Sequence, residues 1–195
     1  MAILQPPQNR FRLWQRLGAL VALSLLFTLT LTQCQAPEPS QRTLATLQRV
    51  VSGDTLEVSG LGEQPALIQT VRLIGIDAPD LVQQPWGEAA RTYLQESLAR
   101  PKDPAAARQI DLEYDLQTSD RFGRQLAYVW SGTTLLNQDL VAQGHALATP
   151  YFPNVRYETD LQAAQEAARL IGRGIWDPTL PLRETPAEFR AQNRN

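Results

Sequence analysis

Cysteine, histidine and lysine are almost absent from this chain. Its 195 residues include one cysteine, Cys34, one histidine, His145, and one lysine, Lys102. A single cysteine excludes an intramolecular disulfide bond. A zinc site built from cysteine and histidine needs more of these ligands than the chain has. Ser-His-Asp catalysis would have to use His145, and no strained serine turn accompanies it, so we expect a packed or surface histidine.

Positive charge is also scarce. The chain has 18 basic against 20 acidic residues, a net charge of −2. Residues 1–33 contain three arginines and no acidic residue, so without them 15 basic residues remain and the net charge is near −5. Because general attraction to nucleic acid scales with the number of basic contacts, this balance argues against a protein that coats nucleic acid. Any binding of a polyanion must depend on a few placed arginines.

The N-terminal segment has the layout of an export signal. Three arginines precede an uncharged apolar run over residues 17–32, and Cys34 follows. The run of about 16 residues is shorter than the roughly 20 that span a bilayer. Residues 31–34 (LTQC) resemble the lipobox of bacterial lipoproteins, although Gln33 stands where a small residue is usual. We predict a signal segment over residues 1–34 with lipid on Cys34; ordinary cleavage, which gives a periplasmic or extracellular protein, and an uncleaved anchor are the alternatives.

The rest of the chain divides into a linker, one domain and a tail. These are residues 35–43, which are polar with two prolines, residues 44–178, and the polar residues 179–195. Apolar alternation between turn residues predicts five strands, near 44–51, 55–58, 66–76, 108–116 and 126–130. Helical spacing predicts three helices, near 87–99, 136–143 and 159–172, the last with a capping-box spacing from Thr159 to Gln162. This order predicts a mainly β fold with added helices, a five-stranded Greek-key barrel.

Three short segments place charged residues beside strands or tight turns. They are residues 51–55 (VSGDT), 71–80 (VRLIGIDAPD) and 119–128 (SDRFGRQLAY). If their strands pair, the turns that carry Asp54 and Asp77 open on the same rim of the barrel. Two close carboxylates repel each other unless a cation lies between them, and hard divalent cations prefer such oxygen ligands. The alternative is that each aspartate only shapes its own turn.

Two arginines complete the pattern. Arg72 is the only charge in an otherwise apolar strand, where its guanidinium needs an anion or water. A phosphate would meet that need, and so would a structural ion pair with a core acid. Arg124 closes a Phe-Gly turn, where a solvated arginine is also ordinary. Taken together, the carboxylates and arginines indicate a metal-dependent phosphodiesterase.

The aromatic residues fall into two groups. Tyr128, Trp130 and Trp176 lie in apolar strand-like or helix-end contexts, which predicts core positions. Tyr151 and Phe152 lie in a loop, where they could stack on a base.

The ordered motifs resemble the staphylococcal (micrococcal) nuclease family, also called thermonucleases, over residues 44–177. The shared features are the G-D-T turn, the R-L-x-x-I-D-x-P and D-R-F-G-R-x-L-A-Y segments, L-V-A-Q-G at 140–144 and G-I-W at 174–176. The resemblance implies an OB-fold barrel and a Ca²⁺-dependent endonuclease that hydrolyses DNA and RNA with little sequence preference.

The resemblance also implies a metal site made of oxygen ligands. At the matching positions, Asp54 and Asp77 supply the calcium carboxylates, the Ala78 carbonyl is a further ligand, and Thr55 lines the site. Two positions depart from the family pattern, since Ala78 replaces a common threonine and Ser52 a common aspartate.

The catalytic set that the resemblance implies is Arg72, Asp80 and Arg124. The two arginines contact the scissile phosphate, and Asp80 stands where the family usually has the glutamate assigned as general base. The aspartate is shorter by one C–C bond, and a base must lie within hydrogen-bond reach of its water. This departure therefore bears on turnover more than on binding.

We interpret the chain as an exported, membrane-tethered, monomeric Ca²⁺-dependent nuclease acting on DNA and RNA, with no protein partner. The alternative is a catalytically weak OB-fold module on a lipoprotein that only binds nucleic acid. Such a module would have no reason to keep the carboxylates together with both arginines. A plain surface lipoprotein would explain Cys34 but none of these residues.

Overall fold

The computed structural model of the protein describes residues 41–99 and 109–193. The predicted signal segment, its Cys34 and most of the predicted linker lie outside these residues. Within the described ranges, no helix has both the length and the apolar character needed to cross a membrane.

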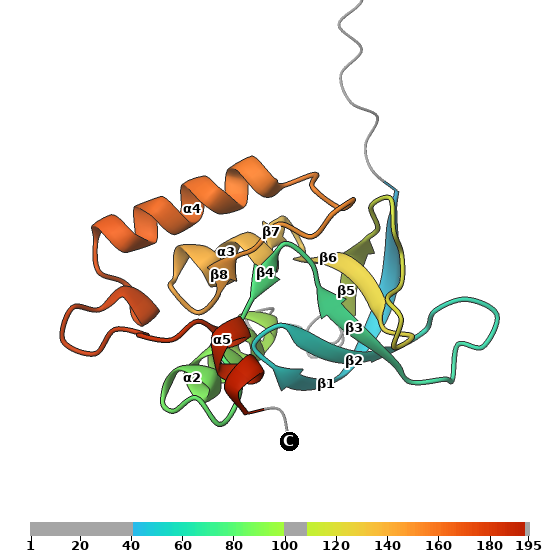
Figure 1. The fold of residues 1–195 in the computed structure, drawn as a ribbon. Coiled ribbons are helices and arrows are strands. Elements are labelled where there is room, and N and C mark those ends of the chain that lie inside the picture. Colours follow the sequence, from blue (N-terminus) through green and yellow to red (C-terminus); the bar gives the residue numbers. More distant parts are fainter. Residues whose placement is uncertain (1–40, 100–108, 194–195) are drawn as a thin grey trace, which may run out of the picture. The chain divides into compact units, whose positions relative to one another are not determined.

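Five strands close into a mixed β-barrel (Figure 1). Neighbouring strands pair antiparallel in the order β3–β2–β1–β5–β6, and a parallel pairing of β3 with β6 closes the ring. This is the arrangement of an OB-fold, so the predicted five-stranded barrel is confirmed. The strands are β1 (Arg42–Ser52), β2 (Thr55–Ser59), β3 (Gln69–Leu73), β5 (Gln109–Glu113) and β6 (Gln125–Ser131).

Strand β1 serves two neighbours because it bends. Its first part, Arg42–Thr46, pairs with β5, and the part from Thr46 to Ser52 pairs with β2. The pairing with β2 shifts register twice, and such bulges increase local bending and twist. The strand can therefore turn the corner of a small barrel and end in the tight turn that leads to β2.

The predicted strand over residues 66–76 is divided in the structure. Strand β3 ends at Leu73, and Gly75 follows in the left-handed region at φ +77°. A short strand β4 (Ile76–Asp77) then pairs with β8 (Leu147–Ala148), outside the barrel sheet. The left-handed glycine ends the extended run, so this strand prediction was too long.

Three helices match the predicted ones and a fourth was not anticipated. The matching helices are α2 (Trp86–Ala99), α3 (Leu136–Ala142) and α4 (Glu158–Leu170). Helix α5 (Pro186–Gln192) lies in the segment expected only to be a polar tail. The short elements β7 (Thr134–Leu135) and η2 (Gly174–Trp176) complete the described fold.

The predicted capping box at Thr159 was wrong. Helix α4 starts one residue earlier, with Tyr157 as N-cap and no side-chain cap, so Thr159 lies inside the first turn. The capping box that the structure contains is in α5, where Thr185 and Glu188 cap each other's backbone N–H groups.

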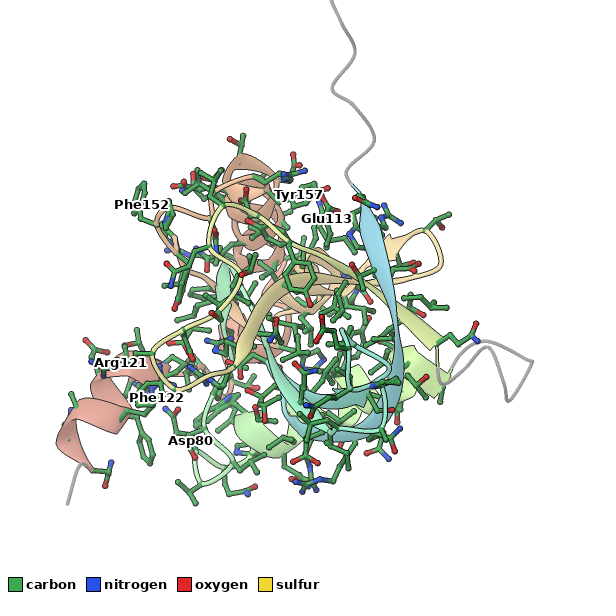
Figure 2. All side chains as sticks on the ribbon, turned by 90° about the vertical axis from the view of Figure 1, so that its right-hand side faces the viewer. Asp80, Glu113, Arg121, Phe122, Phe152 and Tyr157 are labelled. Carbon is green, nitrogen blue, oxygen red and sulfur yellow. The ribbon has the colours of Figure 1, made fainter. Side chains whose placement is uncertain are left out.

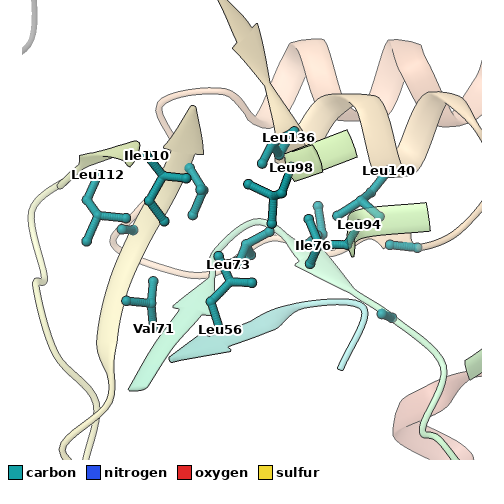
Figure 3. Close-up of a cluster of buried hydrophobic side chains, with 14 of the residues drawn as sticks. Leu56, Val71, Leu73, Ile76, Leu94, Leu98, Ile110, Leu112, Leu136 and Leu140 are labelled. Atoms are coloured by element: carbon teal, nitrogen blue, oxygen red, sulfur yellow. The ribbon is translucent and has the colours of Figure 1, made fainter. Parts of the chain in front are cut away.

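The core fills the barrel and continues under α2 and α3 (Figure 3). Strand leucines such as Leu56 and Leu73 pack with Leu94 and Leu98, on the helix face that the spacing predicted. Burying each such side chain contributes about 1.5–3 kcal/mol, so this contact attaches α2 firmly to the barrel. Tyr128 is fully buried, as predicted, whereas Trp130 and Trp176 are only partly buried.

Gly144 joins α3 to the C-terminal segment and offers a test of the packing. Its φ is +70°, its carbonyl accepts a hydrogen bond of 2.8 Å from the Ile175 N–H, and a Cβ there would overlap the Arg173 carbonyl. We expect Gly144→Ala to lower the free energy of unfolding by about 3 kcal/mol or more, because backbone overlap adds to left-handed strain of about 1–2 kcal/mol. Denaturant titration measures the loss.

The control is Gly132→Ala. Gly132 has a similar φ of +60°, but no atom lies within 4 Å of a Cβ built there. This variant should lose only the strain contribution, about 1–2 kcal/mol. Equal losses at the two positions would contradict the packing role of Gly144.

Candidate active site

Asp54 and Asp77 lie together at one rim of the barrel. Asp54 follows Gly53 in the turn from β1 to β2, and Asp77 ends β4. Both are buried, with 7% and 6% of their surface exposed. The backbone N–H of Ala78 donates to Asp54 Oδ2 at 2.9 Å, which ties the two turns to each other. The expectation that both turns open on one rim is therefore met.

The tight turn before Asp54 depends on small neighbours. A Cβ on Gly53 would lie 2.6 Å from Ala90 Cβ of α2 and 2.8 Å from Ala78 Cβ. Only a glycine lets the turn pack this closely against the helix. Helix α2 thus helps to set the position of Asp54.

Arg72 bridges the two carboxylates. Its Nη1 lies 3.1 Å from Asp54 Oδ2, and its Nη2 lies 3.4 Å from Asp77 Oδ1. The same nitrogens donate to the carbonyl oxygens of Leu73 (2.7 Å) and Ile76 (3.0 Å). For Arg72 the sequence allowed either a phosphate or a structural ion pair. The ion pair is present in the structure, and its partners are the two aspartates of the candidate site.

Two hydroxyl groups orient Asp54 further. Ser52 Oγ and Thr55 Oγ1 each donate to Asp54 Oδ1 at 3.0 Å. Thr55 therefore lies beside the carboxylate, and Ser52 supplies a neutral donor. Charge-assisted hydrogen bonds of this kind fix a carboxylate in one orientation.

A second arginine reaches Asp77 from the C-terminal segment. Arg190 Nη2, from α5, donates to both oxygens of Asp77, at 2.9 and 2.7 Å. Burial raises the pKa of the Asp77 carboxyl, while Arg190 and Arg72 act in the opposite direction. Sequence reasoning missed Arg190, because it lies 113 residues from Asp77 in a polar stretch that carries no motif.

Arg124 is held by its own turn. Its Nε donates to Asp120 Oδ2 at 2.7 Å, and Asp120 Oδ1 accepts the backbone N–H groups of Phe122 and Arg124. Burial opposes ionisation of Asp120, but these hydrogen bonds keep its pKa below the usual value. Strands β3 and β6 pair in parallel, with Arg72 opposite Leu126. Arg124 lies directly before β6, so it is on the chain segment next to the strand of Arg72.

Asp80 follows the Asp77 turn in the loop that leads to α2. It is half-buried; its N–H donates to Gln83 Oε1 at 3.0 Å, and its carbonyl accepts the Gln83 N–H at 2.8 Å. Among the described residues, no hydrogen bond or ion pair joins the Asp80 or Arg124 side chain to Asp54 or Asp77. The structure thus brings Asp54, Arg72 and Asp77 into contact, with Asp80 and Arg124 on adjoining segments.

The two loop aromatic residues, Tyr151 and Phe152, differ in their exposure. Tyr151 is half-buried against the core and Phe152 is 77% exposed, far from Asp80 (Figure 2). Phe122, which is 70% exposed, lies beneath the Arg124 guanidinium, 5.7 Å from it. The D-R-F-G-R segment contained this aromatic residue, but the sequence reasoning did not single it out.

His145 and Glu113 lie in separate clusters. The His145 ring stacks on Tyr93 at 4.5 Å, and burial lowers its pKa. Glu113 is fully buried and accepts hydrogen bonds from Trp130 Nε1 (2.7 Å) and Tyr157 Oη (2.9 Å), well away from Asp80 (Figure 2). Burial, and then the bond to Glu113, raise the pKa of Tyr157 to about 12. These contacts stabilise the fold and lie apart from the carboxylate pair.

The donor chemistry at the rim suits a hard cation. Asp54 and Asp77 offer carboxylate oxygens, which Ca²⁺ and Mg²⁺ prefer. In residues 41–99 and 109–193, no three acidic, histidine or cysteine side chains gather as a metal cluster. A cation here would therefore take its other ligands from carbonyl oxygens and water. Beside it, the arginines offer guanidinium groups to anionic oxygens.

The sequence is similar to a family of known proteins. The family model described as "Staphylococcal nuclease homologue" matches residues 70–178. The chain is 38% identical over 133 residues to the thermonuclease of Staphylococcus hyicus, covering 66% of this chain and 72% of that protein. Identity to the thermonuclease of Staphylococcus intermedius is 35% over 136 residues, covering 67% and 74%. Endonuclease YhcR of Bacillus subtilis (strain 168) is 32% identical over 163 residues, covering 76% of this chain and 12% of that protein.

Proposed function

Because the chain belongs to the staphylococcal nuclease family, we propose that it is a Ca²⁺-dependent endonuclease that hydrolyses DNA and RNA with little sequence preference. One observation carries this proposal. Arg72 lies between the buried carboxylates Asp54 and Asp77, so a cation-binding pair and an anion-binding group meet at one rim. A phosphodiester needs both kinds of group, because attack adds negative charge to its phosphoryl oxygens.

Asp54 and Asp77 would hold the calcium ion, with the Ala78 carbonyl as a further ligand and Thr55 beside Asp54. The bound ion supplies Lewis-acid stabilisation of the charge that develops on the phosphoryl group. Ser52 and Thr55 support this role, because their hydroxyls fix the Asp54 carboxylate. Because the carboxylate is already oriented before the reaction, it does not have to reorganise during the reaction.

Arg72 and Arg124 would bind the scissile phosphate. Arg72 is half-buried, with 14% of its side chain exposed, so its attraction to an anion is less screened than that of a fully exposed arginine. Asp120 supports Arg124, because its carboxylate anchors both the guanidinium and the turn that carries it. A guanidinium can donate two parallel hydrogen bonds to phosphoryl oxygens, which a lysine cannot do.

Asp80 would act as the general base that orients and deprotonates the attacking water. It lies three residues after Asp77 in the same turn region and is half-buried. A base must come within hydrogen-bond reach of its water, directly or through one more water molecule. The loop between Asp77 and α2 therefore connects the cation site with the base.

The first test of this function uses the metal. With plasmid DNA and RNA as substrates, we expect cleavage of both in Ca²⁺ and none in excess chelator. Asp54→Asn should lower the rate about 100-fold or more, because it removes one of two carboxylates. The matched control is Asp160→Asn, an exposed aspartate on α4, which should keep the parent rate.

Two outcomes of this assay would contradict the proposal. Full activity in chelator would show that the reaction does not need a metal. Binding of nucleic acid without cleavage under any of these conditions would favour the alternative, an OB-fold module that only binds.

The second test concerns Asp80. Asp80→Asn should lower turnover by roughly 10²–10⁴ while Ca²⁺ affinity stays near that of the parent, because the loss of a general base affects the chemical step. Asp80→Glu should hold or raise turnover, since it restores the missing methylene. Turnover at saturating Ca²⁺ and the Ca²⁺ dissociation constant are measured for all three proteins. If Asp80→Asn matches the parent in turnover, Asp80 only shapes its turn.

We also propose that the domain is exported and tethered to a membrane by lipid on Cys34. The support is in the sequence, where basic residues, a short apolar run and the cysteine follow one another. Cys34→Ser should block lipid attachment, change the processed size and move the protein out of the membrane fraction. An unchanged size and distribution would exclude the lipoprotein and favour an uncleaved anchor.

A further inference from the structure

The C-terminal segment runs across the loop that carries Asp80. We call residues 177–192 the C-terminal strap. Its early part is fixed by backbone contacts, since the Leu182 N–H donates to the Ile175 carbonyl at 2.8 Å and Trp86 Nε1 donates to the Leu180 carbonyl at 3.3 Å. The strap is thus anchored where α2 begins.

Gln83 connects the strap to the Asp80 loop. Its buried side chain accepts the Asp80 N–H at 3.0 Å and donates to the Glu184 carbonyl at 3.2 Å. A single amide therefore joins the turn of the candidate base to the last residues before α5. This contact directs α5 toward the rim where Asp77 lies.

Helix α5 has only seven residues. Pro186 is buried and lies one turn before Arg190, so both face the domain. Among the described residues, the only hydrogen bonds from α5 side chains to groups outside the strap are those of Arg190 to Asp77. The side chain of Arg190 is 42% exposed, whereas that of Asp77 is 9% exposed, so the arginine approaches from the solvent side.

Arg190 occupies the part of Asp77 that a cation would need. Its Nη2 lies within 2.9 Å of both carboxylate oxygens, and Arg72 already contacts Oδ1 from the buried side. A guanidinium and a divalent cation both bind a carboxylate through its oxygens, so they compete for the same negative charge.

We propose that the C-terminal strap is an autoinhibitory latch in which Arg190 competes with the divalent cation for Asp77. This inference rests on the proposed function, because it assumes that Asp77 binds the cation. While the latch is closed, the carboxylate is neutralised from within the chain. When the cation binds, α5 detaches and opens the rim. The apparent cation affinity equals the intrinsic affinity multiplied by the fraction of molecules in which the latch is open.

The test measures Ca²⁺ affinity rather than cleavage. Isothermal titration of the full chain in detergent gives the Ca²⁺ dissociation constant of the parent, Arg190→Ala and Arg190→Lys. Arg190→Ala should bind Ca²⁺ about three- to tenfold more tightly, since the competing cation is gone. Arg190→Lys keeps the charge and should lie between the two. Arg183→Ala removes an exposed arginine of the same strap and should match the parent.

Hydrogen exchange of the amides in residues 186–192 gives a second readout. In the parent, Ca²⁺ should speed exchange in α5, because the helix loses its attachment. In Arg190→Ala, exchange should be fast with and without Ca²⁺.

The outcomes separate the latch from the proposed function. Equal or weaker Ca²⁺ binding by Arg190→Ala would overturn the latch and leave the calcium site standing. Exchange in α5 that does not respond to Ca²⁺ in the parent would also overturn it. No Ca²⁺ binding by any of the proteins would overturn both proposals.

Discussion

The ion pairs of Arg72 with Asp54 and Asp77 hold together the two turns that form the candidate site. Two buried carboxylates and a half-buried guanidinium lie at one rim, and each would be costly there alone. Removing one partner from a buried pair typically costs about 3–5 kcal/mol, because the other charge is left uncompensated. The turn after β1 and the turn after β3 are therefore coupled through this arginine. The Ala78 N–H reinforces the coupling through the backbone.

Closure of the barrel brings the strand of Arg124 beside that of Arg72. Strand β3 pairs with β2 on one side and with β6 on the other, so the residues near its end meet segments from distant parts of the sequence. Arg72 lies on β3, Asp54 precedes β2, and Arg124 precedes β6. An open sheet would keep β6 away from β3 and separate the two arginines. The place of Arg124 beside the site is thus a consequence of the parallel β3–β6 pairing.

Local patterns predicted much of the fold, and long-range contacts account for what they missed. The apolar spacing of Leu94 and Leu98 identified the buried face of α2, because a single helix face carries that information. The strand predicted through Ile76 was too long. The apolar sequence continues past Leu73, but the left-handed Gly75 turns the chain there. The motifs indicated Asp54, Arg72 and Asp77 as a group. Nothing in a polar C-terminal stretch could indicate Arg190, whose partner is set by tertiary structure.

The acidic charge balance of the domain makes these ion pairs important for phosphate binding. An acidic protein with few basic residues offers little general attraction to a polyanion, so its arginines must act locally. In this structure Arg72 and Arg190 are already paired with Asp77, and Arg124 is paired with Asp120. A phosphate that approaches these arginines therefore meets guanidinium groups that carboxylates already share. Positive charge that neutralises the carboxylates would release the arginines, so cation and phosphate binding would support each other reciprocally at this rim.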